Sequence, residues 1–168
     1  IGAACARALG EAGAVIVVTD FMPDRIEASV AELKKFGIKA DGAKLDDTKS
    51  RDDDAVAADI IKTHGRVDIL VNNAGVAKSS IKAEEMSDEI WRFHLDVNLD
   101  GVFWCCRAFG KTMLQQGKGA IVNVSSIASI RSPKGIAYIA YNASKGAVNS
   151  LTLAIASRGA TVVGMEGA

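Results

Sequence analysis

Apolar positions along this chain follow two alternating periods. Short β-branched runs, typical of buried strands, are separated by segments whose apolar residues recur every three or four positions, as in amphipathic helices. The runs that predict strands are 14–20 (AVIVVTD), 38–46 (IKADGAKLD), 67–75 (VDILVNNAG), 119–126 (GAIVNVSS) and 160–164 (ATVVG). The segments that predict helices are 1–13, 23–37, 51–65, 88–116 and one that contains 141–145 and ends near 157. This order predicts an α/β fold with a parallel sheet and helices on both of its faces.

Composition limits the classes of function. A chain of 168 residues with 49% hydrophobic and 24% charged residues fits one folded domain over residues 1–168. Twenty basic residues balance twenty acidic ones, so the charge gives no reason to expect a nucleic-acid or membrane partner. Every long apolar run is interrupted by a charge or a glycine before it could span a bilayer. No signal-like segment opens the chain, although Ile1 is not a natural start.

The spacing of the cysteines and histidines does not indicate a metal site. Cys5, Cys105 and Cys106 have neither metal-ligand spacing nor the even number of a disulfide set, which favours a reducing, cytoplasmic location. The two adjacent cysteines point about 100° apart on a helix, so we expect them to pack against neighbours. We expect His64 and His94 to be surface residues, since neither has a ligand partner at helical spacing.

Polar residues stand where four of the predicted strands end. Ligands of open parallel sheets bind beyond the carboxyl ends of the strands, so these residues are the first candidates for a site. They are Asp20, Asp46 with Asp47, Asn72 with Asn73, and Ser125 with Ser126.

Asp20 has the position of a ribose-binding acid. It lies 18 residues after Gly2, near the spacing at which a carboxylate binds the adenosine ribose of a dinucleotide. A carboxylate there repels a 2′-phosphate, and Phe21 rather than a base follows it, so NAD is favoured over NADP. A turn or helix cap after the strand explains Asp20 about equally well.

Other candidate residues also have ordinary explanations. The NNAG segment ending at Gly75 lets backbone approach a flat ligand, but a tight turn accounts for it too. Ser126 could donate to a substrate oxygen or simply bond a loop carbonyl. Asn98, in DVNLDG, falls within the long predicted helix and could be exposed to solvent.

Tyr141 and Lys145 are four residues apart on a predicted helix. This spacing places both side chains on one face, with Cβ atoms about 5–6 Å apart. A free phenol titrates near pH 10, and a nearby cation favours the phenolate, which makes a tyrosine usable as a general acid or base near neutrality. A lone Y-x-x-x-K pair is nevertheless far more often an ordinary helix with a surface lysine.

Together, Asp20, NNAG, Asn98, VSS (124–126) and YNASK (141–145) resemble the short-chain dehydrogenase/reductase family over nearly the whole chain. The resemblance implies an incomplete Rossmann-type, doubly wound parallel sheet and a nicotinamide cofactor. It implies that Tyr141 transfers the proton, that Lys145 assists it and holds the nicotinamide ribose, and that Asn98 supports a water chain to the lysine. Ser126 would orient the substrate oxygen, with Ser125 as the fallback.

The same resemblance assigns cofactor contacts. Asp46 and Asp47 look like the pair that flanks the adenine, and Asp20 like the acid at the ribose. Backbone contacts would come from Asn73, Ala74 and Gly75, and Ile1 would be a remnant of the glycine-rich turn. Members of the family commonly dimerise through the long helix and the helix after it, so we expect a homodimer or homotetramer.

The chain also departs from the family pattern. The first strand, most of the glycine-rich turn and the C-terminal elements of the family are missing, so we expect the isolated 168 residues to be weakly active at best. The interval from Ser126 to Tyr141 is longer than in many members and adds a substrate-side loop containing Arg131, Pro133 and Tyr138.

We therefore expect an oxidoreductase that interconverts a secondary alcohol and a ketone, with NAD preferred. A sugar alcohol or other polyol is the favoured substrate class. The alternatives are a reductase of 3-oxoacyl thioesters and a dinucleotide-sensing scaffold without turnover.

Overall fold

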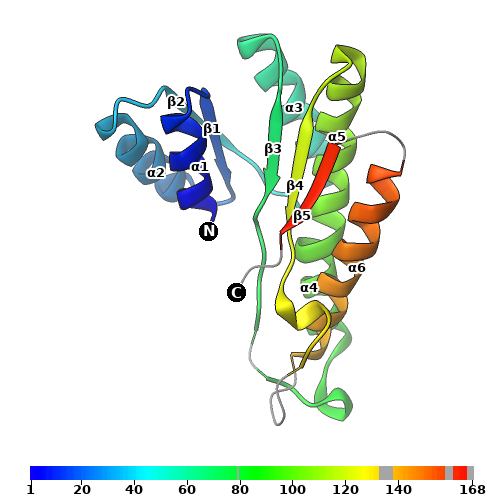
Figure 1. Ribbon diagram of the computed structural model, residues 1–168. Coiled ribbons are helices and arrows are strands. Elements are labelled where there is room, and N and C mark those ends of the chain that lie inside the picture. Colours follow the sequence, from blue (N-terminus) through cyan, green and yellow to red (C-terminus); the bar gives the residue numbers. More distant parts are fainter. Residues whose placement is uncertain (79, 133–137, 158–160, 166–168) are drawn as a thin grey trace.

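The computed structural model describes residues 1–78, 80–132, 138–157 and 161–165. Helices and strands alternate along them as the sequence pattern predicts (Figure 1). The strands are β1 (Ile16–Asp20), β2 (Ala40–Lys44), β3 (Ile69–Asn72), β4 (Ala120–Val124) and β5 (Thr161–Met165). The α-helices are α1 (Gly2–Glu11), α2 (Pro23–Lys35), α3 (Ser50–His64), α4 (Asp88–Leu95), α5 (Gly101–Gln116) and α6 (Ile139–Ala156).

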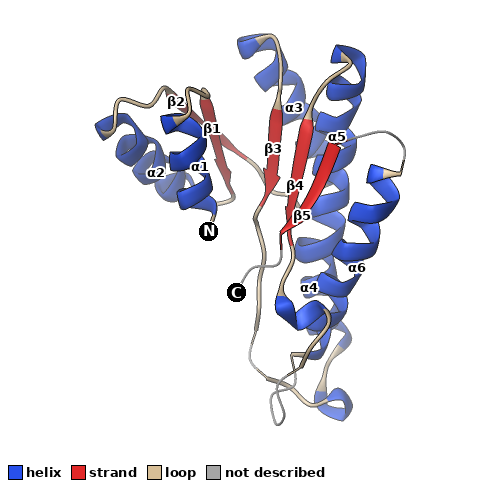
Figure 2. Ribbon diagram, viewed as in Figure 1, coloured by secondary structure: helices blue, strands red, loops and turns tan. Residues whose placement is uncertain are grey.

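The strands form two parallel sheets (Figure 2). In the smaller sheet β1 pairs with β2, from Ile16 opposite Ala40 to Asp20 opposite Lys44. In the larger sheet β4 lies between β3 and β5. Within the described residues, no ladder joins β1 to β3, so the doubly wound sheet is present in two parts. The parallel α/β prediction is confirmed, as is the expectation that the sheet is incomplete.

Each sheet has its own apolar core. Leu33 and Ile38 pack with Ile16 where α1 and α2 cover the smaller sheet. Behind the larger sheet in Figure 1 lie α3 and α5, and α6 packs beside them, with Val148 fully buried against Ile121. Full burial of one such aliphatic side chain stabilises the fold by roughly 1.5–3 kcal/mol.

The long helix predicted for residues 88–116 is not uniform. The α4 helix begins after Ser87, whose hydroxyl accepts a hydrogen bond from the Ile90 N–H, and α5 ends before Gly117, whose positive φ of 70° closes the last turn. Between them Asp96–Asp100 form a π-helical turn that contains Asn98. Single π turns within helices are frequent at functional sites.

No bilayer-spanning segment is found in the described part of the chain, because each helix there is too short or too polar to cross the hydrocarbon layer.

Candidate functional site

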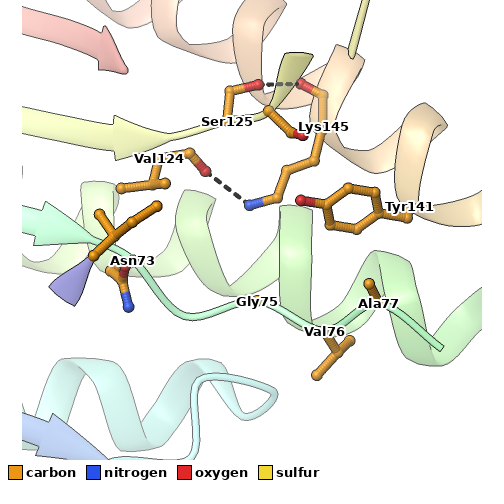
Figure 3. Close-up of a pocket in the computed structure, with 10 residues that line it drawn as sticks. Asn73, Gly75, Val76, Ala77, Val124, Ser125, Tyr141 and Lys145 are labelled. Carbon is orange, nitrogen blue, oxygen red and sulfur yellow. Dashed lines mark hydrogen bonds between the residues drawn. The ribbon is translucent and has the colours of Figure 1, made fainter. Parts of the chain in front are cut away.

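A pocket of about 190 Å³ opens where β3 and β4 end beside α6 (Figure 3). The sequence-predicted residues in its wall are Ile1, Asn73, Gly75, Ser125, Ser126, Tyr141 and Lys145, and the remaining wall residues are Val76, Ala77 and Val124. The structure thus gathers side chains from distant parts of the chain at the carboxyl edge of the larger sheet, as the strand-end argument predicted. Asp20, Asp46, Asp47, Ala74 and Asn98 do not line this pocket.

Tyr141 and Lys145 project into the pocket from the same helix. Lys145 Nζ lies 5.9 Å from the centre of the Tyr141 ring. Figure 3 shows the phenol oxygen directed toward the lysine side chain. The predicted sharing of one helix face is therefore confirmed, and the phenol and the ammonium line the same pocket.

Lys145 is a buried cation with a fixed direction. Its residue is 3% exposed, and Nζ donates a hydrogen bond of 2.7 Å to the Val124 carbonyl. Burial lowers the pKa of the Lys145 ammonium below its usual range, because removal from water penalises the charged form. An ordinary surface lysine is therefore excluded at this position.

The two serines after β4 have different surroundings. Ser125 Oγ donates to the Lys145 carbonyl at 3.0 Å and is thereby committed to holding α6 against the sheet. Ser126 Oγ accepts from the Ala128 N–H at 3.2 Å, which leaves the hydroxyl proton for another partner. The choice of Ser126 over Ser125 as the reactive hydroxyl remains a prediction, and this difference in bonding supports it.

Asn98 lies behind the pocket wall. It is 0% exposed, so the alternative of simple solvent exposure was wrong. Its Oδ1 accepts from the Val76 N–H at 2.7 Å, and its Nδ2 donates to the Val76 carbonyl at 2.9 Å and to Ser144 Oγ at 3.0 Å. Asn98 thus links the segment after β3 to α6, and the water chain suggested for it remains a prediction.

The NNAG segment approaches its neighbours closely. A Cβ on Gly75 would lie 3.3 Å from Lys145 Nζ and 3.4 Å from Asn98 Oδ1, and one on Gly2 would lie 2.7 Å from Asn73 Nδ2. Glycine at position 75 lets the NNAG segment pack against Lys145 and Asn98, and glycine at position 2 lets the start of α1 pack against Asn73. A side chain at either position would displace one of these polar groups. Helix N-termini of this kind favour anions such as a pyrophosphate.

Asn72 serves the sheet rather than the pocket. It is 7% exposed, and its Nδ2 donates to Asn123 Oδ1 on β4 at 2.8 Å and approaches Cys106 Sγ at 3.3 Å. The paired amides join β3 to β4 beneath the site, which the strand-end argument alone could not distinguish from a ligand contact.

Asp20 ends β1 at the smaller sheet. Its Oδ1 accepts from the Met22 N–H at 2.8 Å, so the turn-cap explanation holds, and the ribose contact remains a prediction. Sequence reasoning missed Lys44, which is opposite Asp20 in the β1–β2 register. The Lys44 ammonium lies 5.6 Å from the centre of the Phe21 ring and adds a cation to this end of the sheet.

Asp46 and Asp47 differ although they are adjacent. Hydrogen bonds from Lys49 and Thr48 lower the pKa of Asp46. Burial, with the nearby Asp53 and Asp46 charges, raises the pKa of Asp47 to about 6. Asp53 is 0% exposed and accepts from Cys105 Sγ at 3.0 Å, and burial raises its pKa as well. Burial thus favours the protonated form of the Asp47 and Asp53 carboxyls, and the adenine contact suggested for Asp46 and Asp47 remains a prediction.

The expectation for His94 was wrong. Its residue is 3% exposed, because the ring packs under the segment after β3, whereas His64 is half-buried at the end of α3 beside Asp41. Cys105 and Cys106 are buried thiols packed against neighbours, as expected. Among the described residues, no three His, Cys, Asp or Glu side chains gather closely enough to hold a metal ion.

The described part of the substrate-side loop contains Arg131 and Tyr138. Tyr138 forms a parallel bridge with Ile81 and thereby ties the loop to the segment after β3. Pro133 lies outside the described residues.

Comparison with known proteins gives a consistent result. The profile of the family described as "short chain dehydrogenase" matches residues 1–163. Galactitol 2-dehydrogenase of Rhizobium johnstonii is 40% identical over 157 residues, which are 94% of this chain and 61% of that protein. 3beta-hydroxysteroid dehydrogenase of Mediterraneibacter gnavus is also 40% identical over 157 residues, 93% of this chain and 55% of that protein.

The fold is similar to a solved gluconate 5-dehydrogenase from Burkholderia cenocepacia in complex with NADP and tartrate. The TM-score is 0.86 at 32% identity, over 95% of this chain and 63% of that one. This chain therefore spans less than two thirds of each of these proteins.

Proposed function

Because this chain belongs to the short-chain dehydrogenase family, we propose that the protein is a nicotinamide-dependent oxidoreductase that interconverts a secondary alcohol and a ketone. The observation that carries the proposal is the pocket into which Tyr141 and the buried Lys145 both project, beside Ser126.

The residues present fit a flat dinucleotide. Because Gly2 and Gly75 have no Cβ, their backbone lies directly against the side chains of Asn73 and Lys145, which line the pocket, and the α1 N-terminus faces Asn73. Gly75 and Asn73 would contact the cofactor through backbone, with Ala74 between them and Ile1 at the pocket edge. When bound, the nicotinamide supplies the hydride acceptor and donor.

The protein's own groups would handle the alcohol proton. Tyr141 would take the proton from the substrate hydroxyl in oxidation and return it in reduction. Lys145 would favour the phenolate through its charge, which acts strongly because burial excludes water from it. The Ser126 hydroxyl would donate to the substrate oxygen, and Asn98 would hold the pocket wall.

The substrate class we propose is a sugar alcohol or a related polyol. The similarity to a galactitol dehydrogenase and to a gluconate dehydrogenase supports it. A hydroxysteroid is the second candidate, because a relative of that name is equally similar. Reduction of a 3-oxoacyl thioester is not favoured, since these named relatives act on other compounds.

The cofactor preference we propose is NAD. Asp20 supports it, because a carboxylate at the end of β1 repels a 2′-phosphate. Lys44 opposite Asp20 and the NADP bound in the similar gluconate dehydrogenase argue the other way, so both cofactors must be measured.

We also propose that the protein is a homo-oligomer and that it is located in the cytoplasm. Leu114 on α5 and Leu153 on α6 are 71% and 73% exposed, which suits an interface between copies of the chain. The free thiols Cys5, Cys105 and Cys106 suit a reducing compartment.

The test is a screen of polyols, hydroxysteroids and their ketones at 340 nm with NAD and NADP, on protein expressed from its complete reading frame. Turnover of a polyol with either cofactor supports the proposal. Binding of NADH without turnover of any compound would favour a dinucleotide-sensing scaffold instead.

A further inference from the structure

His94 is a buried histidine with both ring nitrogens in hydrogen bonds. Nδ1 lies 2.8 Å from the Ile90 carbonyl, and Nε2 lies 3.0 Å from the Lys78 amide nitrogen. A carbonyl can only accept and an amide N–H can only donate, so the ring is the neutral tautomer with its proton on Nδ1. The only group it offers to the segment after β3 is therefore an acceptor at Nε2.

His94 and Asn98 act on the same segment. They are four residues apart on the α4 helix and the π turn that continues it. The Asn98 side chain bonds both the backbone N–H and the carbonyl of Val76, and the His94 ring accepts from the backbone N–H of Lys78. The described segment from Gly75 to Lys78 is thus fixed at two points, on either side of Ala77.

This segment is a wall of the catalytic pocket. Gly75, Val76 and Ala77 line the pocket together with Tyr141 and Lys145, and Figure 3 shows them passing opposite these two side chains. His94 also lines a small adjoining cavity of about 10 Å³ with Tyr141 and Lys78. A movement of Lys78 would therefore reach the wall that faces the reacting groups.

We propose that His94 is a positioning residue of the oxidoreductase, which sets the pocket wall by accepting the Lys78 N–H. The role rests on the proposed function, because it concerns the binding of substrate and cofactor in that pocket. An apolar side chain at position 94 would leave the Lys78 N–H without this acceptor and free the segment beyond Val76. His94 does not line the pocket that Tyr141 and Lys145 share, so its loss acts on KM more than on kcat.

The test compares His94→Leu with His94→Gln in protein expressed from its complete reading frame. Glutamine keeps an acceptor oxygen at about the reach of Nε2, and leucine has none. His64→Leu is the matched control, because His64 is a half-buried histidine at the end of α3, away from the pocket. Two measurements are made: amide hydrogen exchange of the peptide that contains residues 73–78, and steady-state kinetics, which give KM and kcat for the alcohol.

We expect His94→Leu to exchange faster in this peptide and to raise KM by about three- to tenfold, with kcat changed less than about twofold, as loss of one hydrogen bond implies. His94→Gln and His64→Leu should match the wild type in both measurements. Equal exchange in the leucine and glutamine variants, or an unchanged KM in His94→Leu, would overturn the proposal.

Two outcomes need separate treatment: a His94→Leu variant that does not fold, and a wild-type protein without activity. If His94→Leu does not fold, His94→Asn replaces it, because its shorter amide does not reach Lys78. If the wild type turns over no alcohol, the proposed function fails, and hydrogen exchange alone decides whether His94 holds the segment.

Discussion

Gly75 lies directly against Lys145: a Cβ at position 75 would be 3.3 Å from the lysine Nζ and 3.4 Å from Asn98 Oδ1. Neither atom is free to move away, since Nζ bonds the Val124 carbonyl and Oδ1 bonds the Val76 N–H. The absence of a side chain at Gly75 therefore helps to keep the ammonium in the pocket.

Gly75→Ala is expected to lower kcat/KM by about three- to tenfold, because a shift of a few tenths of an ångström at a reacting group is costly. Steady-state kinetics measure the loss. Gly110→Ala is the control: its nearest neighbour would be Ile121 Cδ1 at 3.9 Å, an ordinary contact, and alanine favours the helix by about 0.8–1 kcal/mol. Equal effects of the two changes on kinetics would contradict this explanation.

The two serines should differ most in their effect on activity. Ser126→Ala is expected to reduce kcat by about a hundredfold through loss of a donor to the substrate oxygen, and to lower the free energy of unfolding by about 0.5–1 kcal/mol through loss of the bond from the Ala128 N–H. Ser125→Ala should lower the free energy of unfolding by about 1 kcal/mol, because its bond to the Lys145 carbonyl is lost. Kinetics and urea denaturation of both variants check this, and a larger kinetic defect in Ser125→Ala would reverse the assignment.

Asp20→Ser should shift cofactor preference. Serine keeps an acceptor for the Met22 N–H and removes the charge that repels a 2′-phosphate. We expect the ratio of kcat/KM for NADP to that for NAD to rise at least about tenfold. Asp24→Ser, at an exposed carboxylate in the first turn of α2, should leave the ratio unchanged. An unchanged ratio in Asp20→Ser would remove the carboxylate from the selectivity argument.

Asp46 and Asp47 should give opposite pH dependences of stability. The pKa of Asp47 is raised to about 6 in the folded protein, so the folded state keeps this proton longer and the free energy of unfolding falls as pH rises from about 4 to about 6. Asp47→Asn removes this loss and should be more stable than wild type by about 1–2 kcal/mol at pH 7.5, with no difference near pH 4.

The pKa of Asp46 is lowered, so its stabilisation is present above its ordinary value of 3.8 and is lost as pH falls below it. Asp46→Asn should therefore destabilise the protein by about 0.5 kcal/mol at pH 7.5, and less under acid conditions. Urea denaturation at both pH values measures the two variants. If both variants changed the free energy of unfolding in the same direction at pH 7.5, the opposite pKa shifts of Asp46 and Asp47 would be contradicted.

The alternation of elements could be read from the sequence because it depends on local pattern. The β-branched run before Asp20 and the helical spacing around Tyr141 each reflect neighbours close in the chain. The pairing of Tyr141 with Lys145 was predictable for the same reason, since one helical turn joins them.

Contacts between distant residues could not be predicted in this way. Asn72 pairs with Asn123 across 51 positions, and His94 accepts from Lys78 across 16. A lone histidine or asparagine in a helical pattern shows neither its burial nor its partner. The π turn at Asn98 was missed too, because its side-chain bonds to Val76, 22 positions away, have no local signature.

The measurement that tests the central claim most directly is the turnover of the best alcohol by wild type and Tyr141→Phe, followed at 340 nm beside NADH binding by fluorescence. If Tyr141 transfers the proton, the phenylalanine variant should bind NADH as the wild type does and lose at least about a hundredfold in kcat. Turnover within about tenfold of wild type, at equal NADH affinity, would contradict proton transfer by this tyrosine.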